Sequence, residues 1–308
     1  MSEHYIDILE EVKNDRSSGA WVVAQRTIDC LQALSSEKAQ ADAGELISEV
    51  ERVAAEILKA QPGMAQLIHL FNSLFQMMEQ ASSSDTLVLS RKIAGEATRF
   101  DENCVKAVTR VAEIGAELIA PDSVVLIHSN SSTVYQVLKK AHHDSKSFQV
   151  ILTESRPMCE GRTCAERLSQ LGIQCLYLID AAISKGVERA DIVLLGADSL
   201  SENSLVNKVG AKAISLLARE AVIPCYTACE SSKFMPQKLS LKKEVPRDPS
   251  EVWKDAPADI NIENYYFDIV PLDLFTGVIT EEGVLTSTEV GGRIRAQKLH
   301  PKILEMLK

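Results

Sequence analysis

The spacing of apolar residues changes at Pro121, and this change constrains the fold more than any other feature of the sequence. From Tyr5 to about Leu118, apolar residues recur every three or four positions, as in "LISEVERVAAEIL" and "CVKAVTRVAEIGAELI". That spacing is typical of amphipathic helices. We therefore expect residues 1–118 to form an N-terminal helical domain.

Two groups of turn residues interrupt the helical pattern. They are "QPG" at 61–63 and "SSSD" at 82–85, and Asp85 is a candidate N-cap for the next helix. The Met and Phe residues of "FNSLFQMMEQ", at 71–80, fit a helix-packing surface better than a ligand site.

After Pro121, short apolar runs such as "SVVLIH", "FQVILTE", "IQCLYLID", "DIVLLGAD" and "VIPCYTACE" alternate with helical segments. Nearly continuous apolar strands separated by helices indicate a parallel sheet buried on both faces. Residues 119–308 are thus expected to form a doubly wound, mostly parallel, Rossmann-like α/β domain. The polar stretch 237–264 predicts a surface excursion before the apolar residues of 265–286 rejoin the sheet.

Composition narrows the classes of function. The 308 residues carry a net charge of −10, which argues against direct binding to a nucleic-acid backbone. No apolar run approaches the roughly 20 residues of a membrane span, and the N-terminus lacks the features of a signal peptide. We expect a cytoplasmic protein without a membrane partner. The seven scattered cysteines fit reduced thiols, and the sequence predicts neither a metal site nor a cofactor.

Polar side chains follow the apolar strands, at the edge where open parallel sheets bind ligands. The expected strand ends carry His128, Ser129 and Asn130; Thr153 to Pro157; Asp180; Gly196 to Asp198; and Glu230 to Lys233. Helix capping accounts for some of these residues, Arg156 has structural partners available in Glu154 and Asp180, and Asp198 has a possible role in capping the following turn. Polar groups at five successive ends exceed what capping requires. They predict a site for an anionic, phosphorylated ligand.

Five motifs in order resemble one protein superfamily. They are "NDRSSGAWVVAQRTID", "TESRPMCEGRTCAERLSQLGI", "IVLLGADSL", "NSLVNKVGA" and "CESSKF". The chain is similar in these motifs to the superfamily of ribose-1,5-bisphosphate isomerase, methylthioribose-1-phosphate isomerase and the alpha, beta and delta regulatory subunits of translation initiation factor 2B. The resemblance covers most of the chain but does not single out one member.

The resemblance implies residue roles. In the isomerases a Cys at the first strand end works with the Asp of the Gly-Ala-Asp motif, and here these positions are Ser129 and Asp198. The same resemblance implies that Asn207 and Lys208 contact the substrate. It implies phosphate binding by Arg16, Gly19, Ala20, Arg156 and Lys233. Ser204 stands where the family usually has an Asn-Gly turn, and Ala211 stands where it usually has Thr. Both departures weaken the case for the implied substrate contacts more than the case for the implied phosphate contacts.

The missing thiol leaves two functions open. A serine hydroxyl is a much weaker acid than a thiol and usually needs an adjacent base, and His128 is expected to be a packed or capping residue because neighbours on a strand point to opposite faces. The leading interpretation is a homo-oligomeric sugar-phosphate isomerase that converts an aldose 1-phosphate into a ketose phosphate. The alternative is a non-catalytic regulatory subunit, similar to those of initiation factor 2B, that senses a sugar phosphate or nucleotide.

Overall fold

The structure is a computed structural model that describes residues 4–15, 19–81, 85–237, 239 and 244–307. It contains two compact units. The first, here called the helical unit, consists of Met1–Lys106, Ser232–Leu239 and Ala296–Lys308. The second, the sheet unit, consists of Ala107–Ser231 and Ser240–Arg295. The first segment of the helical unit therefore ends at residue 106, whereas the predicted boundary is at 118. Two later segments, 232–239 and 296–308, also belong to this unit. No helix within the described residues is long and apolar enough to cross a membrane.

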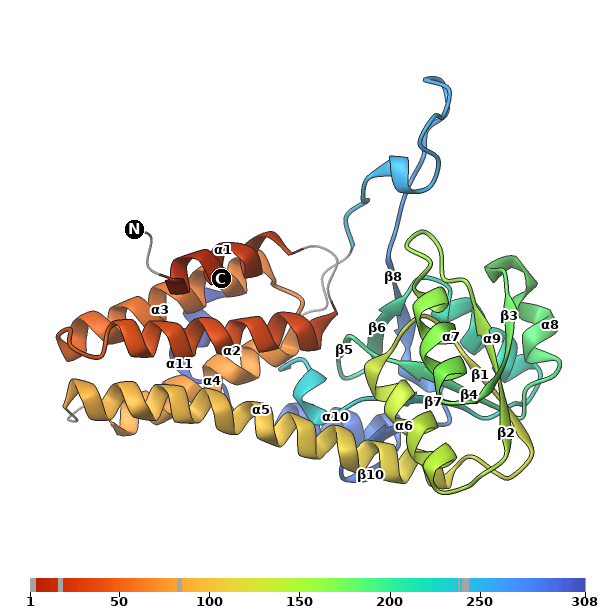
Figure 1. The fold of residues 1–308 in the computed structure, drawn as a ribbon, viewed down its shortest axis with the longest axis horizontal. Coiled ribbons are helices and arrows are strands. Elements are labelled where there is room, and N and C mark those ends of the chain that lie inside the picture. Colours follow the sequence, from red (N-terminus) through yellow and green to blue (C-terminus); the bar gives the residue numbers. More distant parts are fainter. Residues whose placement is uncertain (1–3, 16–18, 82–84, 238, 240–243, 308) are drawn as a thin grey trace. The chain divides into compact units, whose positions relative to one another are not determined.

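The N-terminal helices follow the predicted periodicity (Figure 1). They are α1 (His4–Asn14), α2 (Ala20–Glu37), α3 (Ala43–Ala60), α4 (Ala65–Gln80) and α5 (Thr86–Glu117), and α11 (Pro301–Met306) belongs to the same unit. The turn at 61–63 separates α3 from α4 as predicted. The Oδ1 atom of Asp85 accepts a hydrogen bond from the Leu87 N–H at 2.9 Å, which confirms the predicted N-cap of α5. Residues 82–84 of the other predicted turn lie outside the described residues.

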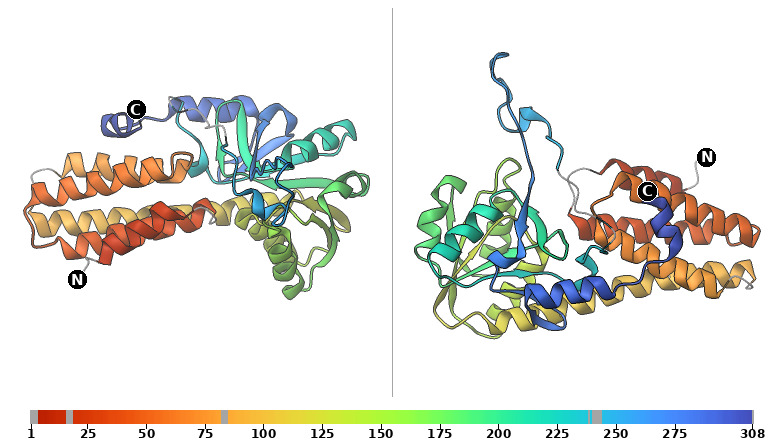
Figure 2. Two further views of the ribbon diagram at one scale, coloured as in Figure 1. Left: turned by 90° about the horizontal axis from the view of Figure 1, so that it is seen from above. Right: turned by 180° about the vertical axis from the view of Figure 1, so that it is seen from behind.

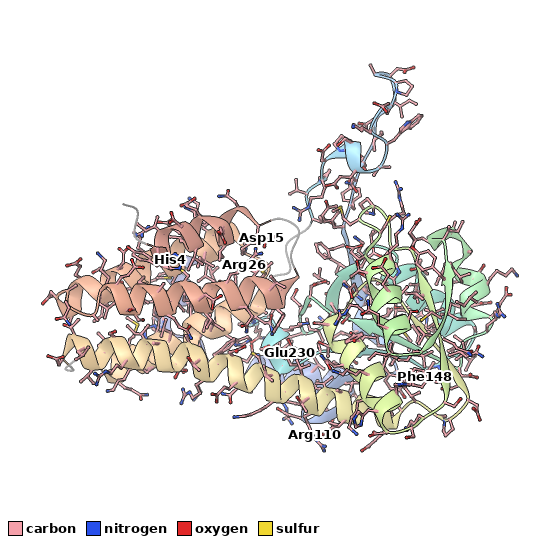
Figure 3. All side chains as sticks on the ribbon, viewed as in Figure 1. His4, Asp15, Arg26, Arg110, Phe148 and Glu230 are labelled. Carbon is pink, nitrogen blue, oxygen red and sulfur yellow. The ribbon has the colours of Figure 1, made fainter. Side chains whose placement is uncertain are left out.

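The aromatic stripe of α4 packs in the core of the helical unit. Phe71, Leu74, Phe75 and Met78 are all buried, and the rings of Phe71 and Phe75 stack with centroids 6.4 Å apart. The prediction of a packing surface is therefore confirmed. Beside this core, Nη1 of the partly exposed Arg26 contacts Oδ2 of Asp15 at 2.6 Å (Figure 3).

The sheet unit is built around a seven-stranded sheet of order β10-β9-β7-β4-β1-β2-β3. Its strands are β1 (Ser123–Ile127), β2 (Phe148–Thr153), β3 (Gln174–Leu178), β4 (Ile192–Gly196), β7 (Cys225–Ala228), β9 (Gly277–Thr280) and β10 (Gly283–Leu285). All neighbours are parallel except β9 and β10. The chain adds β2 and β3 on one side of β1, and later β4, β7 and β9 on the other.

Helices cover both faces of this sheet, as expected for a doubly wound fold (Figures 1 and 2). They are α6 (Ser132–His143) and α7 (Glu160–Gln170) on one face, and α8 (Ile183–Val187) and α9 (Ala211–Glu220) on the other. The core beneath α6 and α7 includes Val125, Leu152 and Leu194 from the strands and Val137 and Leu168 from the helices. The helix α10 (Ser287–Ala296) follows β10, and short 3-10 helices occur at η1 (Asp180–Ala182), η2 (Ser231–Lys233), η3 (Pro249–Glu251) and η4 (Leu272–Leu274).

Two details of the predicted sheet are wrong. The strand β3 is not buried on both faces, because it is an edge strand, and Leu176 and Tyr177 are exposed. The segment 265–286 only partly rejoins the main sheet. Its first strand, β8 (Phe267–Pro271), instead pairs with β6 (Ser204–Lys208) in a separate sheet of order β5-β6-β8, where β5 is Ser199–Leu200. The short hairpin β5–β6 follows β4 directly and offers β8 an open edge.

The predicted surface excursion is confirmed. Between residues 244 and 264 the described chain has no strand and only η3 (Figure 1). Its base is held to the start of β8, because the Glu244 carboxylate accepts the N–H groups of Tyr266 and Phe267 at 2.7 to 3.0 Å. Val245 and Trp253 on this excursion are exposed.

Candidate functional site

The topology places a switch point between β1 and β4. The chain leaves the sheet in opposite directions from these neighbouring strands, which creates a crevice at their carboxyl ends. The crevice has a close approach at Gly196, where an added Cβ would lie 2.5 Å from Ser131 Oγ. Glu230 follows β7 at the same edge, whereas Phe148 begins β2 at the opposite edge (Figure 3). A side chain at position 196 would fill the space between the two strand ends.

Ser129 lies at this edge in an unusual backbone conformation. Its φ of 65° falls in the left-handed region, which costs a non-glycine residue about 1 to 2 kcal/mol. Ser155, at the end of β2, has φ 63° and accepts the Ser129 N–H on its Oγ at 2.8 Å. The bond fixes the turn after β1 and leaves the half-buried Ser129 at the carboxyl edge of the sheet.

His128 is fully engaged in the interior and is not a base for Ser129. The carbonyl of Val209, 2.8 Å from Nε2, can only accept, so Nε2 carries the proton. Nδ1 then accepts from the Thr153 hydroxyl at 2.5 Å. Burial lowers the pKa of His128, which keeps the ring neutral. The prediction that His128 is a packed residue is confirmed.

Asp198 directly precedes the hairpin β5–β6, and Asn207 lies in the second strand of that hairpin. The register pairs Ser199 with Val206, and the Asp198 N–H donates to the Val206 carbonyl at 2.9 Å. Asp198 and Ser199 thus both lie opposite Val206, as in a β-bulge, whereas Asn207 pairs with Asp268 of β8. Asn207 Oδ1 accepts the Lys208 N–H at 2.8 Å, which identifies the other amide atom as nitrogen. That nitrogen, Nδ2, is buried with no hydrogen-bond partner among the described residues.

Lys208 forms an ion pair with the partly exposed Glu160, a contact that the sequence does not predict. Its side chain is 4% exposed, and Nζ lies 2.8 Å from Glu160 Oε1. The Tyr266 ring lies on the same ammonium, with its centroid 5.0 Å away. The charges of Lys208 and Glu160 both act on the pKa of His128, so the pair lies near the end of β1. In the sequence, the Glu-Gly pair at 160–161 follows the polar loop that ends β2 and looks like an ordinary helix start, so it does not signal this contact.

Arg156 and Asp180 have defined structural contacts. The two carboxylate oxygens of Asp180 accept the N–H groups of Ser155 and Arg156, each at 2.8 Å. The exposed guanidinium of Arg156 donates to the Val252 carbonyl at 2.9 Å, so its contact is with the surface excursion. Glu154, the other partner considered for Arg156, receives a hydrogen bond from Arg162. Asp180 thus shapes the loop after β2.

The remaining predicted ligand residues belong to the helical unit. Gly19 is the N-cap residue of α2, Ala20 is the first residue of that helix, and Lys233 ends η2. Arg16 lies outside the described residues. The grouping of Arg16, Arg156 and Lys233 around one phosphate therefore stays a prediction. Among the residues that the structure describes, no cluster of three or more His, Cys, Asp or Glu side chains has metal-binding geometry.

These features define a doubly wound α/β protein with polar groups at the carboxyl edge of its sheet and a helical N-terminal region. The family model of the initiation factor 2 subunit family matches residues 16–287, and the chain belongs to this family. The named relatives fall into two groups, enzymes and initiation-factor-like proteins.

One relative is the ribose 1,5-bisphosphate isomerase of Thermococcus kodakarensis, 31% identical over 91% of this chain and 90% of its own. Another is a putative translation initiation factor eIF-2B subunit 2-like protein of Pyrococcus furiosus, 32% identical over 92% of this chain and 97% of its own. The crystal structure of the Pyrococcus horikoshii translation initiation factor eIF-2B has a TM-score of 0.78 and 30% identity, over 92% of this chain and 98% of that chain. The resemblance to this superfamily and the predicted fold class are therefore confirmed.

Proposed function

We propose that this protein binds a phosphorylated pentose at the carboxyl edge of its sheet and converts an aldose 1-phosphate into a ketose phosphate. The observation that carries the proposal is the buried, unpartnered Nδ2 of Asn207 in β6, the strand whose Val206 carbonyl accepts the N–H of Asp198 after β4. Asp198 supplies a carboxylate able to move a proton, and Asn207 supplies an amide able to donate to a substrate oxygen. The name of the Thermococcus relative, an isomerase of ribose 1,5-bisphosphate, supports this choice of reaction.

The reaction moves hydrogen within one molecule. The bond between C1 and the ring oxygen breaks, the hydrogen on C2 moves to C1, the C2 hydroxyl loses its proton to become a carbonyl, and the ring oxygen gains a proton. Asp198 serves as the acid and base for these transfers, and Ser129 donates a hydrogen bond. Asn207 and Lys208 contact the sugar. Arg16, Gly19, Ala20, Arg156 and Lys233 hold the phosphate groups.

A second function is favoured by one observation at Ser129. The hydroxyl stands where the resembling isomerases have a thiol, and both nitrogens of the adjacent His128 are engaged elsewhere. A serine without a base is a poor proton donor and acceptor at neutral pH. This favours a regulatory protein that binds a sugar phosphate or nucleotide without turnover, in line with the name of the Pyrococcus furiosus relative.

Phosphorus NMR separates the two functions. The protein is incubated with ribose 1,5-bisphosphate, and the appearance of the ribulose product is followed while calorimetry measures binding. Turnover supports the isomerase, whereas saturable binding without turnover supports the sensor. The variant Ser129→Cys should raise the rate of the isomerase, and an unchanged rate would remove this position from the proton transfers. Sedimentation velocity tests the homo-oligomer that the resemblance implies.

A further inference from the structure

Glu160 has one carboxylate oxygen without a partner. Its Oε1 binds Lys208 Nζ at 2.8 Å, whereas Oε2 is buried and accepts no hydrogen bond from the described residues. Buried polar atoms nearly always have a partner, so an orphan oxygen needs an explanation. The unpartnered Nδ2 of Asn207, a side chain that is 6% exposed, precedes Lys208 in the same strand. Glu160, which binds Lys208, thus has an unused acceptor. Asn207, which precedes Lys208 in the chain, has an unused donor.

The local structure holds the Glu160 carboxylate in place. An added Cβ at Gly161 would lie 1.9 Å from the Thr153 carbonyl, so the start of α7 lies directly on the end of β2. Lys208 fixes Oε1, and the Tyr266 ring lies on the Lys208 ammonium. Burial and the nearby Glu251 raise the pKa of Tyr266 to about 12, so its hydroxyl stays protonated and donates to Glu251 at 2.6 Å. Oε2 therefore cannot turn toward another protein donor without breaking the ion pair.

The chemistry of Oε2 selects the ligand group. An ionised carboxylate oxygen only accepts hydrogen bonds, and a phosphate oxygen offers it no donor at neutral pH. The Lys208 charge already balances the Glu160 charge, so a second cation is not required. A neutral hydroxyl is the group that satisfies Oε2 at the lowest cost in desolvation.

We propose that Glu160 is a specificity-determining residue that accepts a hydrogen bond from a secondary hydroxyl of the sugar, so that the site selects a pentose phosphate over its deoxy analogue. This inference rests on the proposed function, because it names the contact that recognises the sugar in the same site. Lys208 acts here as the positioning residue that aims the carboxylate.

The experiment compares three probes by calorimetry: ribose 5-phosphate, 2-deoxyribose 5-phosphate and 3-deoxyribose 5-phosphate. The wild-type protein should bind at least one deoxy sugar about 10- to 100-fold more weakly than ribose 5-phosphate. Glu160→Gln keeps an oxygen for Lys208 and replaces the second acceptor with a donor. This variant should bind ribose 5-phosphate more weakly and bind all three probes within about threefold of one another.

The matched control is Glu154→Gln in the same loop. Glu154 is also a partly buried carboxylate, but its partner is the exposed Arg162, so this variant should keep the wild-type preference. The proposal is overturned if wild-type protein binds all three sugars equally, which would assign Oε2 to a buried water, or if Glu160→Gln keeps the preference. The wild-type comparison needs no variant to fold. Failure to bind both ribose 5-phosphate and ribose 1,5-bisphosphate would instead overturn the proposed function.

Discussion

His69, which is half-buried in the helical unit, and His128, which is buried in the sheet unit, are both held by a backbone carbonyl. Nε2 of His69 lies 2.7 Å from the Phe234 oxygen, and Nε2 of His128 lies 2.8 Å from the Val209 oxygen. The two units differ in backbone conformation. Among the described residues, every non-glycine residue with positive φ belongs to the sheet unit: Asp122, Ser129, Ser145, Ser155, Cys159 and Val222.

Three of these residues lie in the loops that follow β1 and β2, beside the candidate site. Ser129, Ser155 and Cys159 adopt a conformation that costs each of them about 1 to 2 kcal/mol. Such residues persist where surrounding contacts hold them, and they gather at functional sites. The helical unit is thus stabilised by packing without such residues among those that the structure describes. In the sheet unit, left-handed residues lower the stability at the edge where a ligand is expected.

The strongest test of this contrast is Asp198→Asn. The substitution removes the proposed acid and base but keeps the size of the side chain, so isomerisation should fall about 10²- to 10⁴-fold while the affinity for ribose 5-phosphate stays within about threefold. Rates come from phosphorus NMR and affinities from calorimetry. The control Asp273→Asn changes an exposed carboxylate of η4 and should be active. Wild-type rates in Asp198→Asn would remove this residue from the mechanism.

In the helical unit the largest effect should be on stability. Phe71→Ala deletes a fully buried ring that stacks on Phe75, and it should lower the free energy of unfolding by about 3 to 5 kcal/mol. Phe71→Leu keeps most of the volume and should cost about 1 kcal/mol. Urea unfolding curves measure both. A near-native stability for Phe71→Ala would mean that the α4 stripe is not the core of this unit.

Ser155→Ala tests the support of the strained turn. The side chain is fully buried, and its loss leaves the Ser129 N–H without an acceptor, so we expect a loss of about 1 to 3 kcal/mol. The matched variant is Ser145→Gly, at an exposed residue of the sheet unit with φ 60°. Glycine relieves the left-handed strain there, and stability should rise by about 0.5 to 1 kcal/mol. Equal changes at the two sites, measured by chemical unfolding, would refute a special role for Ser155.

The smallest effect concerns acid sensitivity. Burial lowers the pKa of both His69 and His128 below the usual value of about 6.5. Below pH 6.5 the unfolded chain binds protons that the folded chain does not. The stability is therefore fully present above pH 6.5 and falls as the pH decreases, by up to about 1.4 kcal/mol per pH unit for each histidine.

His128→Asn should reduce this slope between pH 5 and 6.5, whereas His142→Gln, at an exposed position of α6, should not. Unfolding at a series of pH values gives the slope. An unchanged slope in His128→Asn would contradict a neutral, buried ring.

Much of the site could be predicted because polar residues at strand ends are visible in the sequence. Ser129, Asp198 and Asn207 are predicted in this way or by resemblance. Glu160 and Tyr266 could not be found, because their roles depend on Lys208, which is 48 residues from Glu160 in the chain. The local pattern around Glu160 looks like an ordinary helix start.

The sequence by itself determined the two kinds of secondary structure, their order and the polar edge of the sheet, because hydrophobic period and turn residues act over a few neighbouring positions. The tertiary structure alone decided that β8 pairs with β6 in a second sheet and that β3 lies at an exposed edge. It also decided which oxygen of Glu160 is occupied. These outcomes depend on contacts between distant parts of the chain, which a local pattern cannot specify.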